Sequence, residues 1–196
     1  MLAVIILAAG ESTRMGKPKA LVKFREQSFL ETVISNFHKA GVEQILVVLG
    51  FAANQIFATM KMHPMQVVIN KKYPLGQFSS FQTGVQKLGS NIDGTFLSLV
   101  DQPQIGVHVI NKMVKAFQNN SDKIILPVYR GKRGHPAIFP KTFFPKILSS
   151  PATNSAADLI HKHPKQIYEM EVDDECILWN INTKQDLEAV RKKFSI

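Results

Sequence analysis

Short, continuous apolar runs alternate along the chain with segments whose apolar residues recur every three or four positions. The continuous runs predict buried strands, at residues 2–7, 45–49, 67–70, 95–100 and 123–128. Helices are expected between them, at residues 28–41, 51–60, 79–88 and 107–117. The first helix is the best marked, because Ser28 and Glu31 have the spacing of a capping box and Gly41 follows as a C-terminal glycine.

Strands and helices alternate strictly over the first 130 residues, which predicts a mostly parallel sheet with helices on both faces. The remaining elements are expected as a turn and return strand within residues 129–139, strands at 167–172 and 177–182, and helices at 142–148, 154–161 and 184–194. The fold class is therefore α/β, a three-layer α/β/α arrangement of Rossmann-like type. A chain of 196 residues suits one domain, residues 1–196, at about 150 residues per domain.

Composition removes several classes of protein. Hydrophobic residues make up 45% of the chain, enough for a sizeable core, and the single cysteine, Cys176, excludes an internal disulfide and a multi-cysteine metal site. No apolar run reaches the ~18 residues that a membrane span requires. The apolar start lacks a preceding basic segment, which favours a buried first strand over a signal peptide. We expect a cytoplasmic protein with no membrane partner.

The net charge of +9 suits an anionic partner, which is a nucleic acid, an anionic membrane or a phosphorylated small molecule, unless the charge is only a solvated surface. A nucleic-acid binder is disfavoured, because the chain contains no RNP-like aromatic motif or zinc finger. Ligands of such a sheet bind beyond the carboxyl ends of its strands. That rule selects three loops, at residues 8–19, 76–80 and 101–103.

The loop after the first strand carries the most chemistry. Ala8, Ala9 and Gly10 have almost no side chain, so their backbone N–H groups can approach an anion closely, and Ser12 adds a hydroxyl. The cations that follow suit a polyphosphate; they are Arg14, Lys17 and Lys19. The loop is neither a Walker loop nor a G-x-G-x-x-G fingerprint, which disfavours a dinucleotide-binding oxidoreductase.

The other loops add candidate ligands. Gly76 and Ser80 stand at a helix start, where they either contact a nucleotide or simply cap the helix. Asp101 ends the strand at 95–100, and a carboxylate placed there can hold Mg²⁺ together with substrate phosphates. The segment Gly-Lys-Arg-Gly-His-Pro at 131–136 brings Arg133, suited to a phosphate, and His135, which reads equally well as a structural turn histidine.

The motif L-A-A-G-x-S-x-R-M-G-x-x-K, which begins at Leu7, resembles the signature of the MobA-like NTP transferases, the molybdenum-cofactor nucleotidyltransferase group. The resemblance implies a nucleotide-diphospho-sugar-transferase-like fold and a Mg²⁺ cofactor. It also implies roles for individual residues. They are nucleotide contacts for Leu7, Ala8, Ala9, Gly10, Ser12, Gly76 and Ser80; phosphate contacts and catalysis for Arg14 and Lys19; catalysis and metal binding for Asp101; and acceptor contacts for Gln102, Arg133 and His135.

The implied reaction is transfer of a nucleoside monophosphate from an NTP to a phosphorylated acceptor, with release of pyrophosphate. Leu-Ala-Ala-Gly and Gly-His-Pro resemble the cytidylyltransferase, MocA-like branch and favour CTP, whereas Asn-Ile-Asn-Thr at 180–183 resembles the guanylyltransferase branch. Asn182 stands where many cytidylyltransferases have a second metal-binding aspartate, so it is expected to contribute a neutral metal ligand. The implied acceptor is the molybdenum cofactor, with docking to a molybdoenzyme; a non-catalytic nucleotide-binding accessory protein is the alternative.

Overall fold

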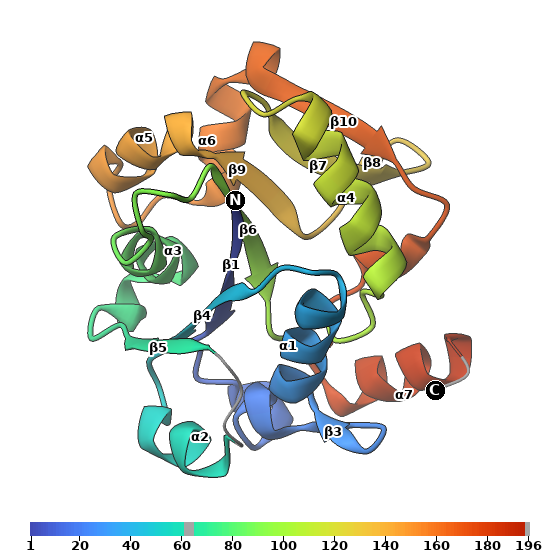
Figure 1. Ribbon diagram of the computed structural model, residues 1–196. Coiled ribbons are helices and arrows are strands. Elements are labelled where there is room, and N and C mark those ends of the chain that lie inside the picture. The colour runs from blue at the N-terminus through green and yellow to red at the C-terminus, as the bar shows by residue number, and fades with distance from the viewer. Residues whose placement is uncertain (61–64, 195–196) are drawn as a thin grey trace.

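The computed structural model describes residues 1–60 and 65–194, and these form an eight-stranded sheet in the order β10-β7-β9-β6-β1-β4-β5, with β8 paired to β7 (Figure 1). The strands are β1 Leu2–Ala8, β4 Gln44–Leu49, β5 Gln66–Ile69, β6 Gly94–Leu99, β7 Ile124–Tyr129, β8 Lys132–Arg133, β9 Ala137–Pro140 and β10 Ile167–Glu171. Pairing is parallel except at β8 and at β9, which runs antiparallel to both β6 and β7. The mostly parallel sheet is confirmed.

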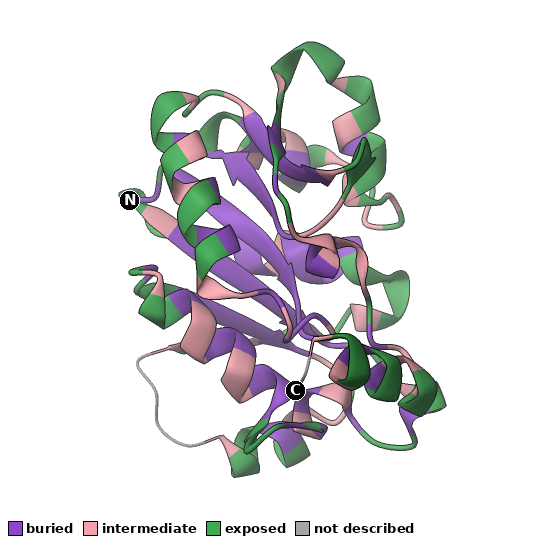
Figure 2. Cartoon of the chain, turned by 90° about the vertical axis from the view of Figure 1, so that its right-hand side faces the viewer, coloured by how far each residue is buried: buried purple, intermediate pink, exposed green. Residues whose placement is uncertain are grey.

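Helices cover both faces of the sheet. The core on one face includes residues of α1 (Phe29–Lys39), α2 (Ala53–Thr59), α4 (Val107–Asn119) and α7 (Lys184–Lys193). The core on the other face includes residues of α3 (Gln77–Val85), α5 (Phe144–Ser149) and α6 (Ala156–Lys162). Successive side chains of a strand point to opposite faces, so Ile6 joins the first core and Ile5 the second. The buried sheet between exposed helix surfaces makes three layers (Figure 2).

The expected capping box of α1 is present: the Ser28 hydroxyl accepts from the Glu31 N–H at 3.2 Å, and the Glu31 carboxylate accepts from the Ser28 N–H at 2.8 Å. Thr183 and Asp186 form the same motif at the start of α7. Short elements that the apolar pattern did not predict complete the chain. They are a hairpin of β2 (Lys23–Phe24) and β3 (Gln27–Ser28) and 3-10 turns at Thr13–Met15, Lys19–Leu21, Tyr73–Leu75, Lys141–Phe143, Pro164–Gln166 and Glu175–Leu178.

The strand expected at residues 177–182 is wrong. Asp174 caps a 3-10 turn there by accepting from the Cys176 N–H at 2.9 Å, and the residues after the turn run without regular structure. Ile177 and Ile181 are fully buried, which explains the apolar signal. The backbone bonds instead to two separate loops, since the Ile177 carbonyl accepts from His135 N and Ile181 N donates to the Asp101 carbonyl. Within residues 1–60 and 65–194, no helix has the length and apolarity to cross a membrane.

Candidate nucleotide and metal site

The loop between β1 and the 3-10 turn at Lys19–Leu21 is closed by its own hydrogen bonds. Ser12 adopts the left-handed conformation, with φ 56°, and its hydroxyl accepts from the Lys19 N–H at 3.1 Å. The side chain of Met15 is buried and fastens the middle of the loop to the core. The folded loop therefore fixes the backbone of Lys19 close to the carboxyl ends of the strands.

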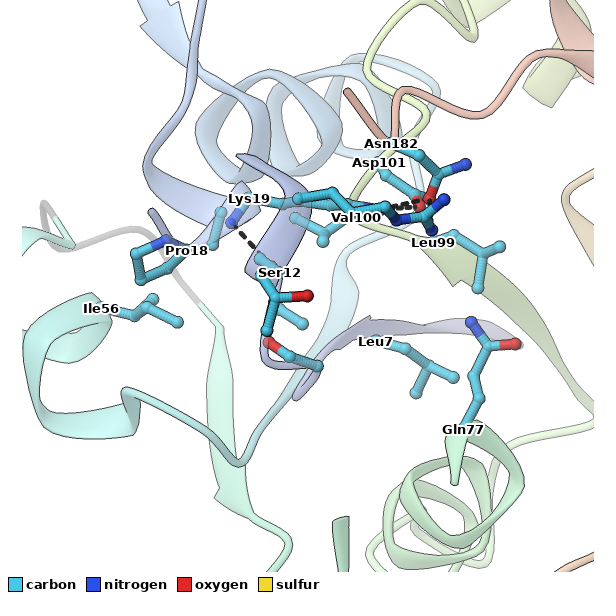
Figure 3. Close-up of a pocket in the computed structure, with 15 residues that line it drawn as sticks. Leu7, Ser12, Pro18, Lys19, Ile56, Gln77, Leu99, Val100, Asp101 and Asn182 are labelled. Carbon is cyan, nitrogen blue, oxygen red and sulfur yellow. Dashed lines mark hydrogen bonds and ion pairs between the residues drawn. The ribbon is translucent and has the colours of Figure 1, made fainter. Parts of the chain in front are cut away.

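Three predicted residues from distant parts of the chain meet there (Figure 3). The Lys19 ammonium Nζ lies 2.7 Å from Oδ2 of Asp101 and 2.7 Å from Oδ1 of Asn182. Asp101 is the second residue after Leu99, the last residue of β6. Arg14 adds a longer contact, from Nη2 to the same Asn182 oxygen at 3.4 Å. The side chains of Lys19 and Asp101 are only 15% and 16% exposed, so their ion pair is poorly screened by solvent.

The segment that carries Asn182 is held in place by backbone and side-chain hydrogen bonds. Ile181 N donates to the Asp101 carbonyl at 2.9 Å, and Asn182 N donates to the Asp186 carboxylate at 2.9 Å. Gln102 is buried and donates from Nε2 to Oδ1 of Asn180 at 2.6 Å. Gln102, for which an acceptor contact stays a prediction, is not among the residues that line the pocket, and its bond to Asn180 supports the segment that carries Asn182.

The pocket around this cluster contains most of the predicted first-loop residues. The residues predicted from the sequence that line it are Leu7, Ala8, Gly10, Ser12, Arg14, Lys19, Asp101 and Asn182. Ala9, Gly76 and Ser80 line a neighbouring hollow that shares Leu7, Gly10 and Gln77 with it. Sequence reasoning missed Gln77 and Ile56, which also line the main pocket. Gln77 follows Gly76 at the start of α3 and lies across the pocket from Asp101 (Figure 3).

Ser80 is buried and accepts a hydrogen bond from Nδ2 of Asn70 at 3.0 Å. Asn70 also donates to Ser79 at 2.9 Å and accepts from the backbone N–H of Lys72 at 2.8 Å, so it ties the end of β5 to the start of α3. This network was not expected. It gives Ser80 a structural bond in addition to its place beside the hollow.

The two acceptor candidates of the 131–136 segment lie differently. Arg133 is exposed on β8 and its Nη2 pairs with Glu169 at 2.6 Å, outside the lining of the pocket. His135 is close enough to Asp101 to feel its charge, but burial is the larger effect and lowers the pKa of the imidazole. Its Nδ1 is buried with no hydrogen-bond partner among the described residues. His135 is thus buried and within the electrostatic influence of Asp101, whereas Arg133 is exposed and paired with Glu169; neither residue is among those that line the pocket.

The oxygens around Lys19 suit a hard divalent cation. Asp101 Oδ2 and Asn182 Oδ1 already converge on a single positive atom, and Asp101 Oδ1 has no hydrogen-bond partner within residues 1–60 and 65–194. The same residues hold no group of three or more His, Cys, Asp or Glu side chains placed for a metal. One carboxylate plus substrate phosphates and waters is the usual donor set of Mg²⁺, so the site fits this ion in the presence of a nucleotide.

Comparison with protein families gives a match to the MobA-like NTP transferase domain over residues 4–167. The chain belongs to this family. This MobA-like NTP transferase is 25% identical to the molybdenum cofactor cytidylyltransferase of Escherichia coli, with 97% of this chain and 96% of that one covered. It is 23% identical to the nicotine blue oxidoreductase of Paenarthrobacter nicotinovorans, with 98% and 94% covered.

Among solved structures, Rv0371c of Mycobacterium tuberculosis has a TM-score of 0.86 and 25% identity to this MobA-like protein, over 97% of both chains. A manganese complex of Rv0371c has a TM-score of 0.83 at 24% identity, over 97% of this chain and 98% of that one. The family and the fold expected from the first-loop motif are both confirmed.

Proposed function

We propose that this protein is a Mg²⁺-dependent nucleotidyltransferase that moves a nucleoside monophosphate, preferably from CTP, to a phosphorylated acceptor of the molybdenum-cofactor class. The observation that carries the proposal is the meeting of Lys19, Asp101 and Asn182 in the lining of a pocket to which the small-residue loop after β1 also contributes. A cation that can bind a triphosphate and a carboxylate that can bind a metal are therefore in direct contact, as the ion pair of Lys19 and Asp101.

In this reaction an acceptor phosphate oxygen forms a bond to the α-phosphorus, and the bond from that phosphorus to the bridging oxygen breaks to release pyrophosphate. A phosphate is already ionised at neutral pH, so no general base is required. Lys19 and Arg14 would neutralise the triphosphate and the departing pyrophosphate, which is the main form of catalysis available to phosphoryl-type transfer. Mg²⁺ held by Asp101 and Asn182 would supply further positive charge at the α-phosphate.

Support for the choice of nucleotide comes from the motifs and from one relative. Leu-Ala-Ala-Gly at 7–10 and Gly-His-Pro at 134–136 favour CTP, as does the full-length similarity to a cytidylyltransferase. Asn-Ile-Asn-Thr at 180–183 favours GTP. CTP is the first choice because its motifs include the Leu-Ala-Ala-Gly loop, which contributes Leu7, Ala8 and Gly10 to the lining of the pocket.

The test is pyrophosphate release from CTP, GTP, ATP and UTP, each with Mg²⁺ and isolated molybdenum cofactor. CTP should be the best substrate, and Asp101→Asn should lower its turnover by about 10²–10³, as removal of a charge contact commonly does. Asp122→Asn is the matched control, since Asp122 is exposed in the turn before β7, and it should leave turnover unchanged. Pyrophosphate release from GTP alone would move the proposal to guanylyl transfer.

Absence of pyrophosphate release with every nucleotide would refute the proposed reaction. Mg²⁺-dependent thermal stabilisation by an NTP in the same preparation would then support the accessory-protein alternative. The oxidoreductase named above would become the better guide only if neither pyrophosphate release nor NTP binding were found.

A further inference from the structure

The Lys19 ammonium occupies the position between the two oxygens that the proposed function gives to the metal. Its Nζ is 2.7 Å from both Asp101 Oδ2 and Asn182 Oδ1, and these are its hydrogen bonds to side chains within residues 1–60 and 65–194. The backbone of Lys19 is fixed separately, by the Ser12 hydroxyl. Only the flexible four-carbon stem therefore has to turn for the ammonium to leave these oxygens.

We propose that Lys19 and the divalent metal are alternative occupants of the Asp101–Asn182 oxygens, so that the metal enters only when a nucleotide draws Lys19 away. The inference rests on the proposed function and adds an order of events to it. Without nucleotide, Lys19 neutralises Asp101 and closes the cation site. With nucleotide, the triphosphate takes the ammonium, and the released oxygens accept the metal.

Charge accounts for the exclusion. The oxygens that would hold the metal carry one negative charge, that of Asp101, and Lys19 already balances it at 2.7 Å, because Asn182 is neutral. A second carboxylate, Asp186, accepts from the backbone N–H of Asn182 and interacts with the charge of Arg14. A divalent ion that entered while Lys19 remained would meet the repulsion of an ammonium at contact distance, where solvent screens little. One carboxylate and one amide also supply too few ligands for Mg²⁺, which needs the phosphate oxygens to complete its shell.

The experiment measures Mn²⁺ binding by the loss of the free-ion EPR signal, with no turnover in the readout. Wild-type protein alone should bind Mn²⁺ weakly. A non-hydrolysable CTP analogue should strengthen binding, seen as a loss of signal beyond that of the same analogue and Mn²⁺ without protein. Lys19→Met keeps an unbranched side chain, one atom shorter, without the charge. It should bind Mn²⁺ without nucleotide at least about tenfold more tightly than wild type, because a like charge at contact distance has been removed.

Lys17→Met is the matched control. It removes the same charge from the same loop, but Lys17 is exposed and does not line the pocket, so its Mn²⁺ affinity should stay near that of wild type. The Lys19→Met gain should also vanish in the double variant Lys19→Met/Asp101→Asn, because the gain requires the freed carboxylate.

An equal gain in Lys17→Met and Lys19→Met would overturn the proposal, since the effect would then be general electrostatics. So would tight Mn²⁺ binding by the wild type without nucleotide. The measurements with the CTP analogue test the proposed function separately from the exchange. An analogue that strengthens Mn²⁺ binding while Lys19→Met shows no gain refutes the exchange alone. A Lys19→Met gain with no nucleotide effect would show that Lys19 excludes the metal, but it would overturn the nucleotide-triggered exchange and count against the nucleotidyltransferase.

Discussion

Gly134, the second glycine of the Gly-Lys-Arg-Gly-His-Pro segment, is a position at which one added methyl group should disturb the candidate site. A Cβ built there would lie 2.5 Å from the carbonyl oxygen of Ile177 and 2.7 Å from Cγ1 of the same residue. Both distances are far inside van der Waals contact. Gly134→Ala therefore requires the 131–136 segment and the segment carrying Ile177 to move apart.

Neither segment can move freely. Gly134 N donates to the Pro127 carbonyl at 2.8 Å, and His135 N donates to the Ile177 carbonyl at 3.0 Å, while the Ile177 side chain is fully buried. Overpacking of this kind costs typically about 1–3 kcal/mol of folding free energy. Because Asn182 lies five residues after Ile177 on the same irregular segment, part of the displacement should reach the Lys19 cluster and weaken nucleotide binding.

The assay is urea unfolding combined with thermal shift in CTP and Mg²⁺. We expect Gly134→Ala to unfold at lower urea with an unchanged m value and to show a smaller nucleotide-induced shift. The control is Gly89→Ala, where the added Cβ meets only the side chain of exposed Asn91, so both measurements should match wild type. A Gly134→Ala protein with wild-type stability and an undiminished shift would refute the argument that close packing at Gly134 positions Asn182.

Other predictions follow from single contacts. Ser28→Ala removes the side-chain cap of α1 and should lower the free energy of unfolding by about 1 kcal/mol, measured in urea; no change would show that the cap is dispensable. Burial raises the pKa of the Cys176 thiol, so Ellman's reagent should leave native protein unlabelled at pH 8 and label it in denaturant. Burial lowers the pKa of His135 from its ordinary value of 6.5, so the unfolded chain binds this proton more readily. Stability should therefore fall as the pH drops below 6.5, and an identical pH slope in His135→Gln would contradict that assignment.

The sequence predicted the sheet well because its strands are continuous aliphatic runs whose burial on both faces leaves a strong local signal. The expected strand at residues 45–49 and the observed β4, Gln44–Leu49, differ by one residue. Helix ends were less well placed. The helix expected at residues 79–88 is observed at Gln77–Val85, since Gly76, with φ 109°, turns the chain and allows α3 to begin at the next residue.

The site was predictable in part. Arg14, Lys19 and Asp101 follow or end strands whose carboxyl ends share one edge, so a topological rule is enough to group them. Gln77 lies in the 76–80 loop that the same rule selects, but nothing in the sequence singled it out from its neighbours. Ile56 carries no such signal, because its contact with the pocket depends on how α2 packs. The segment 177–182 was wrongly predicted as a strand for a similar reason. Ile177 and Ile181 are apolar because they are buried, whereas their backbone partners lie in loops distant in sequence.

Asn182 links the fold to the proposed order of binding. An aspartate at this position would add a second negative charge beside Asp101, and one ammonium at 2.7 Å would no longer balance the pair. A divalent ion would then be attracted to the site before any nucleotide arrived. The neutral amide keeps the oxygen that a metal can use but leaves the resting cluster balanced by Lys19 alone. Asn182 therefore weakens metal binding in the absence of nucleotide, and this weakness is what makes metal binding depend on the nucleotide.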